Sequence, residues 1–351
     1  MIPIEVLKKK TVAFYISRAD GKGDYPARRA AYLAKEIAEE ANCLFIVGEQ
    51  SPPAPDGFKS IEIGKNSSLL QALAVLRPDL LVRDSGSTFS EEVEKIIEIV
   101  PSVLHFDDFG EGGQHADLVL QTLYSETAEE VADHYVIDRN LFIADESYLP
   151  FAKIGLKKKA PGPLPHLVIS FGEEDEGNLS YRALRHVSQL QIPLKVTILI
   201  GERYPHDVST LRMMALGRRN TVIMQPPYHV PEVYADADVI LCSSGYMPYE
   251  IALLGIPTIV LSQNEFEVGL SFPKEQHGFI HLGLGRKVKQ SNLLNAIMEP
   301  LLHESLRQRA VDRQLALNLG NGKESVLEAI RYYLEYPKRG TSGKEMSDML
   351  Q

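Results

Sequence analysis

The stretch that decides the fold lies at residues 239–263 and reads VILCSSGYMPYEIALLGIPTIVLSQ. Its first four residues form an apolar run that predicts a buried strand, and the small polar segment after that run leads into a helix beginning near Tyr249. A second apolar run, at 257–261, predicts another strand after this helix. A strand, a helix and a further strand in this order indicate two parallel strands joined by a crossover helix.

The same alternation continues along the rest of the chain. Further strands are predicted at 12–16, 44–47, 60–63, 80–83, 103–106, 118–121, 167–171, 195–200 and 221–224, with 257–261 as the last clear strand. A basic, Pro- and Gly-rich run at 157–165 indicates a linker between two halves. The fold class is therefore α/β, with two doubly wound, Rossmann-like parallel-sheet domains that face a cleft. We expect these domains at 1–158 and 159–351, with the last helix as a candidate for crossing back to the first domain.

Composition excludes several classes of protein. The chain has 351 residues, of which 44% are hydrophobic and 24% charged, as is ordinary for a globular protein. Its net charge of −10 argues against a broad phosphate-binding surface, so no nucleic-acid partner is expected. No apolar run approaches the roughly 18 residues of a transmembrane segment, and the first ten residues do not resemble a signal peptide. Cys43 and Cys242 have no metal-site spacing, and we expect a cytoplasmic protein.

Loops that directly follow strands are the candidate site, because ligands in doubly wound folds bind at the carboxyl ends of the strands. Gly21 and Gly23 precede the first helix and suit an anion at its N-terminus, or form a plain strand-to-helix turn. Gly172 begins a loop with four consecutive acids at 173–176. These acids would repel a phosphate unless they point away from it; the alternatives are a helix-capping region and a divalent metal site.

The loop at 243–245 has the strongest ligand-binding pattern. Ser243, Ser244 and Gly245 offer hydroxyl and N–H groups at a helix N-terminus, which suits a diphosphate; the alternative is an ordinary N-cap. Glu250 lies one turn further into the helix, where its carboxylate can accept both hydroxyls of a ribose.

Two other loops contain chemically useful groups. After the strand at 257–261, Asn264 and Glu265 can bind sugar hydroxyls, or form only a polar loop. After the strand at 103–106 comes a loose group made of His105, Asp107, Asp108 and His115. A catalytic pair or a metal site is one interpretation of this group, and interdomain or helix-cap hydrogen bonding is the other. Asp236-Ala237-Asp238 precedes its strand rather than following it, which argues against a DxD metal motif.

Residues 237–245 and 249–258 resemble the "ADxxIxxGGxSxYExxxxGxP" signature of two-domain GT-B proteins related to the MurG transferase. The segment at 169–172 is similar to the "SFGGSDP" loop of these proteins, and the segment at 18–20 to their opening "RAD". Together with Gly278 and the segments at 261–263 and 281–285, these matches look most like two relatives. They are the spore coat polysaccharide biosynthesis glycosyltransferases and the UDP-sugar hydrolase of pseudaminic acid synthesis.

The resemblance implies a nucleotide-sugar donor of the UDP or CMP type, bound in the second domain. Ser243, Ser244, Gly245 and Tyr249 belong to its donor-binding motif, with Glu250 on the ribose. It also implies a sugar or glycan acceptor on the side of the first domain. No metal and no cofactor are implied, because helix dipoles and loop amides stabilise the leaving diphosphate.

The sequence departs from this pattern at three places. The family's histidine base aligns with Asp24 or, when the match is anchored on Arg29, with Pro26. Met247 stands where the family has Ser or Thr, and the acids at 173–176 replace "GGSDP". We therefore take Asp24 or Asp108 as the candidate base. The predicted function is glycosyl transfer in surface-polysaccharide or sugar-nucleotide biosynthesis; nucleotide-sugar hydrolysis and non-catalytic sugar or nucleotide binding stay open.

Overall fold

The computed structural model describes residues 9–17, 23–49, 51–64, 68–125, 133–157, 164–226 and 228–337. These residues form two compact units. The first contains the described residues of Met1–Tyr124, Ala128–Ile143 and Asn321–Gln351, and the second contains those of Ser125–Thr127 and Ala144–Gly320. Gly21 lies outside the described residues, as does the segment at 158–163 of the expected linker.

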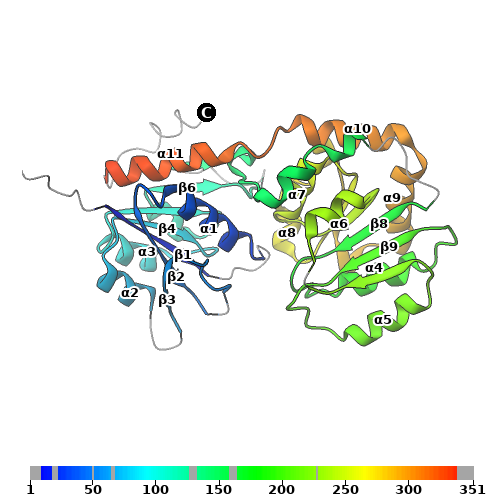
Figure 1. Ribbon diagram of the computed structural model, residues 1–351, viewed down its shortest axis with the longest axis horizontal. Helices are drawn as coiled ribbons and strands as arrows, with labels where there is room; N and C mark the ends of the chain where they lie inside the picture. Colours follow the sequence, from blue (N-terminus) through cyan, green and yellow to red (C-terminus); the bar gives the residue numbers. More distant parts are fainter. Residues whose placement is uncertain are drawn as a thin grey trace, which may run out of the picture. The chain divides into compact units, whose positions relative to one another are not determined.

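Each unit is built on a parallel sheet with helices on both faces (Figure 1). The strands are β1 (Thr11–Ile16), β2 (Asn42–Val47), β3 (Lys59–Glu62), β4 (Leu80–Asp84), β5 (Ser102–Phe106), β6 (Leu118–Gln121), β7 (Tyr135–Ile137), β8 (His166–Ser170), β9 (Lys195–Leu199), β10 (Thr221–Met224), β11 (Val239–Cys242), β12 (Thr258–Ser262) and β13 (Phe279–Leu284). The α-helices are α1 (Tyr25–Ile37), α2 (Leu69–Leu76), α3 (Ser90–Ile97), α4 (Leu179–Val187), α5 (Val208–Leu216), α6 (Val230–Asp236), α7 (Met247–Leu254), α8 (Glu265–Gly269), α9 (Gln290–Leu302), α10 (Glu304–Ala316) and α11 (Gly322–Glu335).

The first unit has the strand order β3-β2-β1-β4-β5-β6-β7. Successive side chains of a strand point to opposite faces, so each central strand contributes to two cores. Val12 and Phe14 of β1 lie in the core covered by α1 and α11, whereas Ala13 lies in the core covered by α2 and α3. Near-continuous apolar strands are what a parallel sheet covered on both faces requires.

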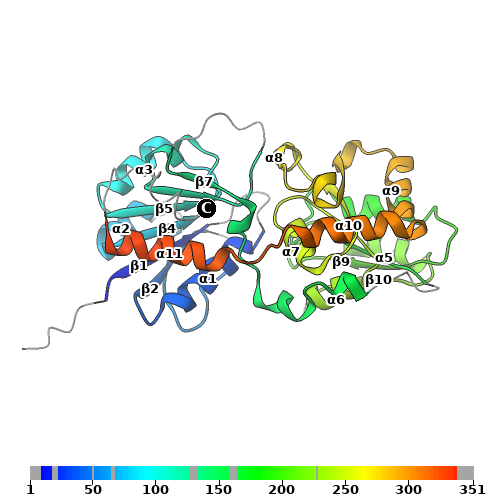
Figure 2. The ribbon, with the colours of Figure 1, turned by 90° about the horizontal axis from the view of Figure 1, so that it is seen from above.

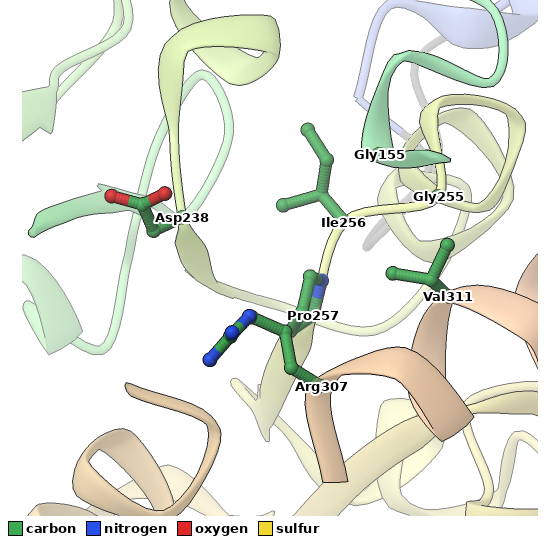
Figure 3. Close-up of a pocket in the computed structure, with 7 residues that line it drawn as sticks. All are labelled: Gly155, Asp238, Gly255, Ile256, Pro257, Arg307 and Val311. Atoms are coloured by element: carbon green, nitrogen blue, oxygen red, sulfur yellow. The ribbon is translucent and has the colours of Figure 1, made fainter. Parts of the chain in front are cut away.

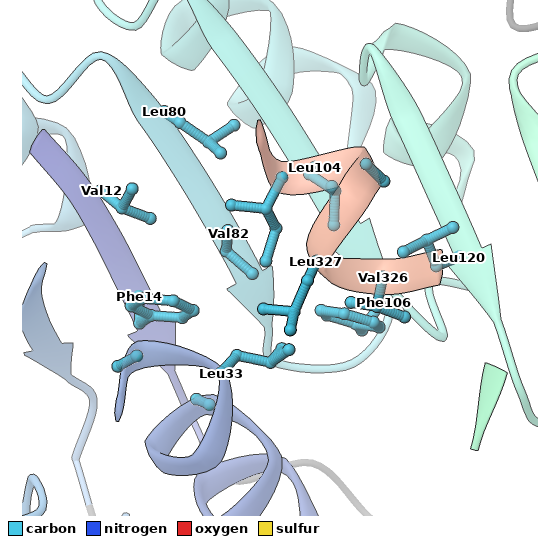
Figure 4. Packing of buried hydrophobic residues seen from close by; sticks show 14 of the residues in the cluster. Val12, Phe14, Leu33, Leu80, Val82, Leu104, Phe106, Leu120, Val326 and Leu327 are labelled. Atoms are coloured by element: carbon cyan, nitrogen blue, oxygen red, sulfur yellow. The ribbon is translucent and has the colours of Figure 1, made fainter. Parts of the chain in front are cut away.

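Helix α11 completes the first unit, although it comes last in the described chain. It lies beside α1 on one face of the sheet (Figures 1 and 2). Figure 4 shows Val326 and Leu327 of α11 packed with Leu33 of α1 against the strands. Ser102 Oγ of β5 also donates to the Tyr333 carbonyl oxygen, over 3.1 Å.

The second unit has the strand order β10-β9-β8-β11-β12-β13. Its main core lies between the sheet and α4, α5 and α9, where Leu167, Leu184 and Ile297 are fully buried. Helices α6 and α7 contact the sheet from the other side, and α10 packs against α7. Both units therefore have the doubly wound α/β architecture that the sequence predicts.

The unit boundary differs from the expected position at 158–159. The chain enters the second unit at Ala144, because the 3₁₀ segment Glu146–Phe151 packs against α6 and α7. The linker interpretation rested on Pro and Gly content, which does not register these contacts.

Two strands were missed, and 257–261 is not the last strand. Strand β7 has only three residues. Strand β13 pairs with β12 as an edge strand, and its sequence FIHLGL contains a histidine and a glycine that weaken the apolar signal. Among the described residues, no helix is long and apolar enough to cross a membrane.

Candidate functional site

The order of the strands predicts where a ligand would bind in each sheet. Strand order reverses beside β1 in the first unit and beside β8 in the second. In doubly wound sheets the ligand crevice lies at the carboxyl ends of the strands next to this reversal. The loops after β8, β11 and β12 form this edge in the second unit, and the loops after β1, β4 and β5 form it in the first.

The loop between β11 and α7 has the backbone geometry of an anion site. Gly245 adopts φ +82°, a left-handed conformation that suits glycine, and α7 begins two residues later. Within the described part of the chain, the N–H groups of Gly245 and Met247 donate to no acceptor. Among the described residues, Ser243 Oγ has only the Met247 thioether as acceptor, at 3.3 Å, and a thioether is a weak acceptor. Helix N-termini with donors of this kind bind phosphate or carboxylate groups.

Ser244 is held from two sides. Its hydroxyl lies 3.0 Å from Ser262 Oγ, and Ser262 Oγ lies 2.8 Å from His281 Nε2. Its backbone N–H donates to Glu267 Oε2 at 3.3 Å, and the N–H of Gln263 donates to the same oxygen at 2.8 Å. One hydrogen-bond network thus connects the loop after β11, the end of β12 and the middle of β13. Ser262, Glu267 and His281 were not among the predicted site residues.

Glu267 is the buried acid of this network. Glu267 is 1% exposed. Burial raises the pKa of its carboxyl group to about 7, although the N–H groups of Gln263 and Ser244 favour the ionised form. Asn264 Oδ1 accepts from the Glu267 N–H at 2.9 Å and so caps α8. The spacing Asn264-x-x-Glu267 matches a helix-start pattern, which was the available signal for this acid.

Of the other two donor-site candidates in α7, one is a core residue. Tyr249 is fully buried and stacks on Phe272, with ring centroids 3.6 Å apart, so its assignment to ligand binding is corrected: this ring packs the interior of the unit. Glu250 is 5% exposed, and its Oε2 accepts from the Tyr148 hydroxyl at 3.0 Å.

The two candidate residues in the loop after β12, Asn264 and Glu265, have different surroundings. Asn264 is the N-cap residue just described, so its amide oxygen has a structural role. Glu265 is exposed and pairs with Lys287 at 3.4 Å. Neither side chain belongs to the hydrogen bonds of Ser244.

The acidic loop after β8 uses its charges internally. Asp175 accepts from the N–H groups of Leu179 and Ser180, at 2.7 and 2.8 Å, and thereby caps α4. Burial raises its pKa to about 6. Glu174 pairs with Arg203 at 3.2 Å. Gly172 adopts φ +81° with open space around it, and the capping interpretation of this loop is confirmed.

In the first unit, Asp108 is a structural anchor. It is 1% exposed, and its two oxygens accept from the Thr88 N–H and hydroxyl, the Gly110 N–H and His105 Nδ1. Burial works against ionisation, but the bonds from His105 and Thr88 prevail and the pKa of Asp108 is lowered. The choice of Asp108 as a base is corrected, because a saturated and buried carboxylate has no lone pair directed at a substrate.

A second anchor in this unit was not anticipated. Arg29 of α1 pairs with Asp84 at the end of β4, at 2.7 Å, and with Asp107 after β5, at 2.9 Å. The guanidinium also lies 4.0 Å from the centroid of the Phe106 ring. Asp107 Oδ1 in turn accepts from the N–H groups of Thr122 and Leu123, so these charges fix α1 and three strand ends.

Asp24 remains as the candidate base. It occupies the N-cap position of α1, is partly exposed, and makes no side-chain capping bond. Gly23, just before it, adopts φ +58°. In the described chain, no group of three or more His, Cys, Asp or Glu side chains is arranged to hold a metal ion.

A pocket in the second unit lies away from these loops (Figure 3). It is lined by Gly155, Asp238, Gly255, Ile256, Pro257, Arg307 and Val311. Asp238 and Pro257 directly precede β11 and β12, so the pocket is at the amino ends of the strands. Asp238 Oδ2 accepts from the His166 N–H at 2.8 Å, which confirms that the DxD segment is at the wrong edge for a donor site.

No family model matches the chain. An uncharacterized protein of Methanocaldococcus jannaschii is 21% identical over 299 residues, covering 82% of this chain and 58% of that protein. The chain thus spans less than two thirds of the length of this relative. The spore coat polysaccharide biosynthesis protein SpsG of Bacillus subtilis is 22% identical over 249 residues, covering 66% of this chain and 70% of SpsG.

Solved structures match over nearly the whole chain. MurG of Acinetobacter baumannii has a TM-score of 0.61 and 15% identity, over 92% of this chain and 99% of that chain. MnaA of S. aureus, solved with UDP, has a TM-score of 0.62 and 16% identity, over 93% and 97%. UDP-GlcNAc 2-epimerase of Neisseria meningitidis, solved with UDP-GlcNAc, has a TM-score of 0.55 and 12% identity, over 92% and 99%. These likenesses establish the fold: the chain is a two-domain α/β protein with the GT-B architecture.

Proposed function

We propose that this protein is a nucleotide-sugar enzyme whose second unit binds the diphosphate of the donor at the start of α7. The observation that carries the proposal is the pair of backbone N–H groups, of Gly245 and Met247, that donate to no acceptor in the described chain. They begin a helix at the carboxyl edge of the sheet, beside the weakly bonded hydroxyl of Ser243. This position and these donors suit an anion.

The proposed reaction is transfer of the sugar to an acceptor hydroxyl. The N–H groups at α7 and the helix dipole would stabilise the charge that develops on the leaving diphosphate, without a metal ion. Glu250, one turn further along α7, would accept hydrogen bonds from the ribose. Asp24 would remove the proton from the acceptor hydroxyl.

The substrate class is supported by similar proteins. MnaA and the N. meningitidis epimerase were solved with UDP and UDP-GlcNAc, which favours a UDP-linked sugar here. SpsG is a polysaccharide biosynthesis protein, which favours a glycan as the acceptor. The unpaired cysteines Cys43 and Cys242 fit a reducing cytoplasm.

Calorimetric titration with UDP, CMP, CDP, GDP, ADP and dTDP tests the binding step, with and without magnesium. We expect one nucleotide to bind, and Ser243→Ala to weaken it about tenfold, because a hydroxyl bonded to a phosphate is a charge-assisted donor. Ser291→Ala, at an exposed position of α9, is the matched control. Absence of binding by every nucleotide would refute the proposal.

A second candidate is a binding protein without turnover. It is favoured by one observation: both the hydroxyl and the N–H of Ser244 are already used inside the protein. Incubation with the nucleotide-sugar that binds, followed by product analysis with and without glycan acceptors, separates the candidates. Transfer gives a glycosylated acceptor, hydrolysis gives free sugar, and a binding protein gives neither.

A further inference from the structure

Ser244 stands at the meeting point of two different hydrogen-bond arms. One arm is neutral and runs from Ser244 Oγ through Ser262 Oγ to His281 Nε2, over 3.0 and 2.8 Å. The other arm joins the Ser244 N–H to the Glu267 carboxylate at 3.3 Å. Both arms end on a titratable group, and both converge on the loop that carries the N–H donors of Gly245 and Met247.

The neutral arm determines what the Ser244 hydroxyl can do. If His281 Nε2 carries the proton, it donates to Ser262, Ser262 donates to Ser244, and the Ser244 hydroxyl hydrogen is left to point at a ligand. A serine in this arrangement is a donor aimed at an anion. Removing Ser262 or His281 takes away that orientation without removing Ser244.

The charged arm acts on the same place through its charge. Glu267 is 1% exposed, so its negative charge is poorly screened, and it lies one hydrogen bond from the loop that would receive a phosphate. Two like charges this close in a dry environment disfavour each other strongly. An arriving phosphate therefore favours the protonated carboxyl group.

We propose that Ser262, His281 and Glu267 are positioning residues that fix Ser244 for the donor phosphate, and that Glu267 takes up one proton from solvent when the phosphate binds. This inference rests on the proposed function of the β11–α7 loop. It adds a proton-coupled step to nucleotide binding.

Among Cys242, His281 and Glu267, whose pKa values are shifted by burial, Glu267 is the one with a pKa near neutral pH. Burial holds the pKa of Cys242 at the end of β11 well above its ordinary value, so this thiol stays neutral. Burial also lowers the pKa of His281 on β13, which favours a neutral imidazole. Glu250, in the first turn of α7, accepts from the Tyr148 hydroxyl, and Glu265 on α8 pairs with Lys287 at the surface. Burial raises the pKa of Glu267 to about 7.

Calorimetric titration of the full chain with UDP, between about pH 6 and about pH 8 and in two buffers of different ionisation enthalpy, tests the proposal. The variants are Glu267→Gln, Ser262→Ala and His281→Gln, with Glu299→Gln, at an exposed position of α9, as the matched control. The ionisation of UDP itself is common to all of them and cancels in the comparison.

We expect the affinity of wild type to fall about tenfold more across this pH range than the affinity of E267Q, and E299Q to behave like wild type. Wild type should take up protons on binding relative to E267Q. S262A should weaken binding about fivefold at every pH. H281Q should weaken it less than S262A does, because the Gln amide can still donate a hydrogen bond to Ser262.

Parallel pH profiles of wild type and E267Q would overturn the role of Glu267. Unchanged affinity in S262A would overturn the neutral arm. If E267Q does not fold, the number of protons that wild type takes up on binding, measured in the two buffers, still tests the role of Glu267. The proposal requires this uptake to exceed the uptake expected from the ionisation of UDP alone. If neither wild type nor E299Q binds any nucleotide, the proposed function itself has failed. This result differs from nucleotide binding that does not depend on Glu267.

Discussion

The first six strands of the two sheets follow the same order, but the side chains at the carboxyl edges of the two sheets differ in chemistry. In the first unit the edge is held by buried charges: Arg29 between two carboxylates, and Asp108 with four donors. In the second unit the edge is held by hydroxyls, an imidazole and Glu267, whose pKa of about 7 places it between neutral and charged. The first edge is built from charged groups paired within the unit, whereas the second keeps backbone N–H donors at the start of α7.

This difference indicates a division of work between the units. Buried ion pairs with every partner in place are costly to disturb, so they suit loops that must not move. Neutral hydroxyl chains and a carboxyl group near its pKa can change hydrogen-bond direction at small cost, so they suit a loop that must receive an anion. Breaking each edge should therefore have different consequences.

The largest expected effect is on the first edge. Arg29→Met should lower the free energy of unfolding by about 3–5 kcal/mol, because Asp84 and Asp107 would remain as buried charges without their cation. Urea unfolding followed by circular dichroism measures this loss. A loss below about 1 kcal/mol would mean that the network contributes little and that the comparison is wrong.

Asp108→Asn should cost about 3 kcal/mol. The amide of Asn presents an NH₂ group to donors from Thr88, Gly110 and His105, so at least one buried bond becomes unsatisfied. The same urea measurement applies, with the exposed Asp56→Asn as control. Nucleotide affinity should stay unchanged; a selective loss of affinity with full stability would instead assign Asp108 to the ligand.

Glu267→Gln should change how stability depends on pH. The folded-state pKa of about 7 lies above the ordinary 4.5, so between these pH values the folded protein binds more protons than the unfolded chain. Wild-type stability attributable to Glu267 is thus fully present below about pH 4.5 and falls as the pH rises toward 7. Relative to wild type, E267Q should gain about 2–3 kcal/mol between about pH 5 and about pH 8. Parallel stability curves for the two proteins would contradict this.

Ser262→Ala should have the smallest effect on stability, about 1 kcal/mol, because it removes two neutral hydrogen bonds and buries no new charge. Thermal unfolding detects a change of this size. A cost as large as that of Arg29→Met would show that the two edges are equally rigid.

The fold could largely be predicted from the sequence, because buried parallel strands such as 239–242 are continuous apolar runs with polar residues on either side. Strand β13 escaped because His281 and Gly283 interrupt its apolar pattern. The site was less readable. Tyr249 lies in the first turn of α7, where its ring fits either a ligand or the interior. Only its stacking on Phe272, 23 positions later, decides between them. The network of Arg29, Asp84 and Asp107 joins three separate segments, so no local sequence spacing predicts it.

The position of α11 has a consequence for the order of events during synthesis. The second unit is formed almost wholly by residues 144–320, so it can fold as soon as that segment has left the ribosome. The first unit cannot, because α11, which covers one face of its sheet together with α1, begins more than 280 residues after α1 ends. Until α11 has been synthesised, the apolar side chains of Val12, Val82 and Leu104 are not fully covered. The N-terminal unit is therefore expected to be the last to become stable, and a nascent or truncated chain exposes its sheet to aggregation or to chaperones.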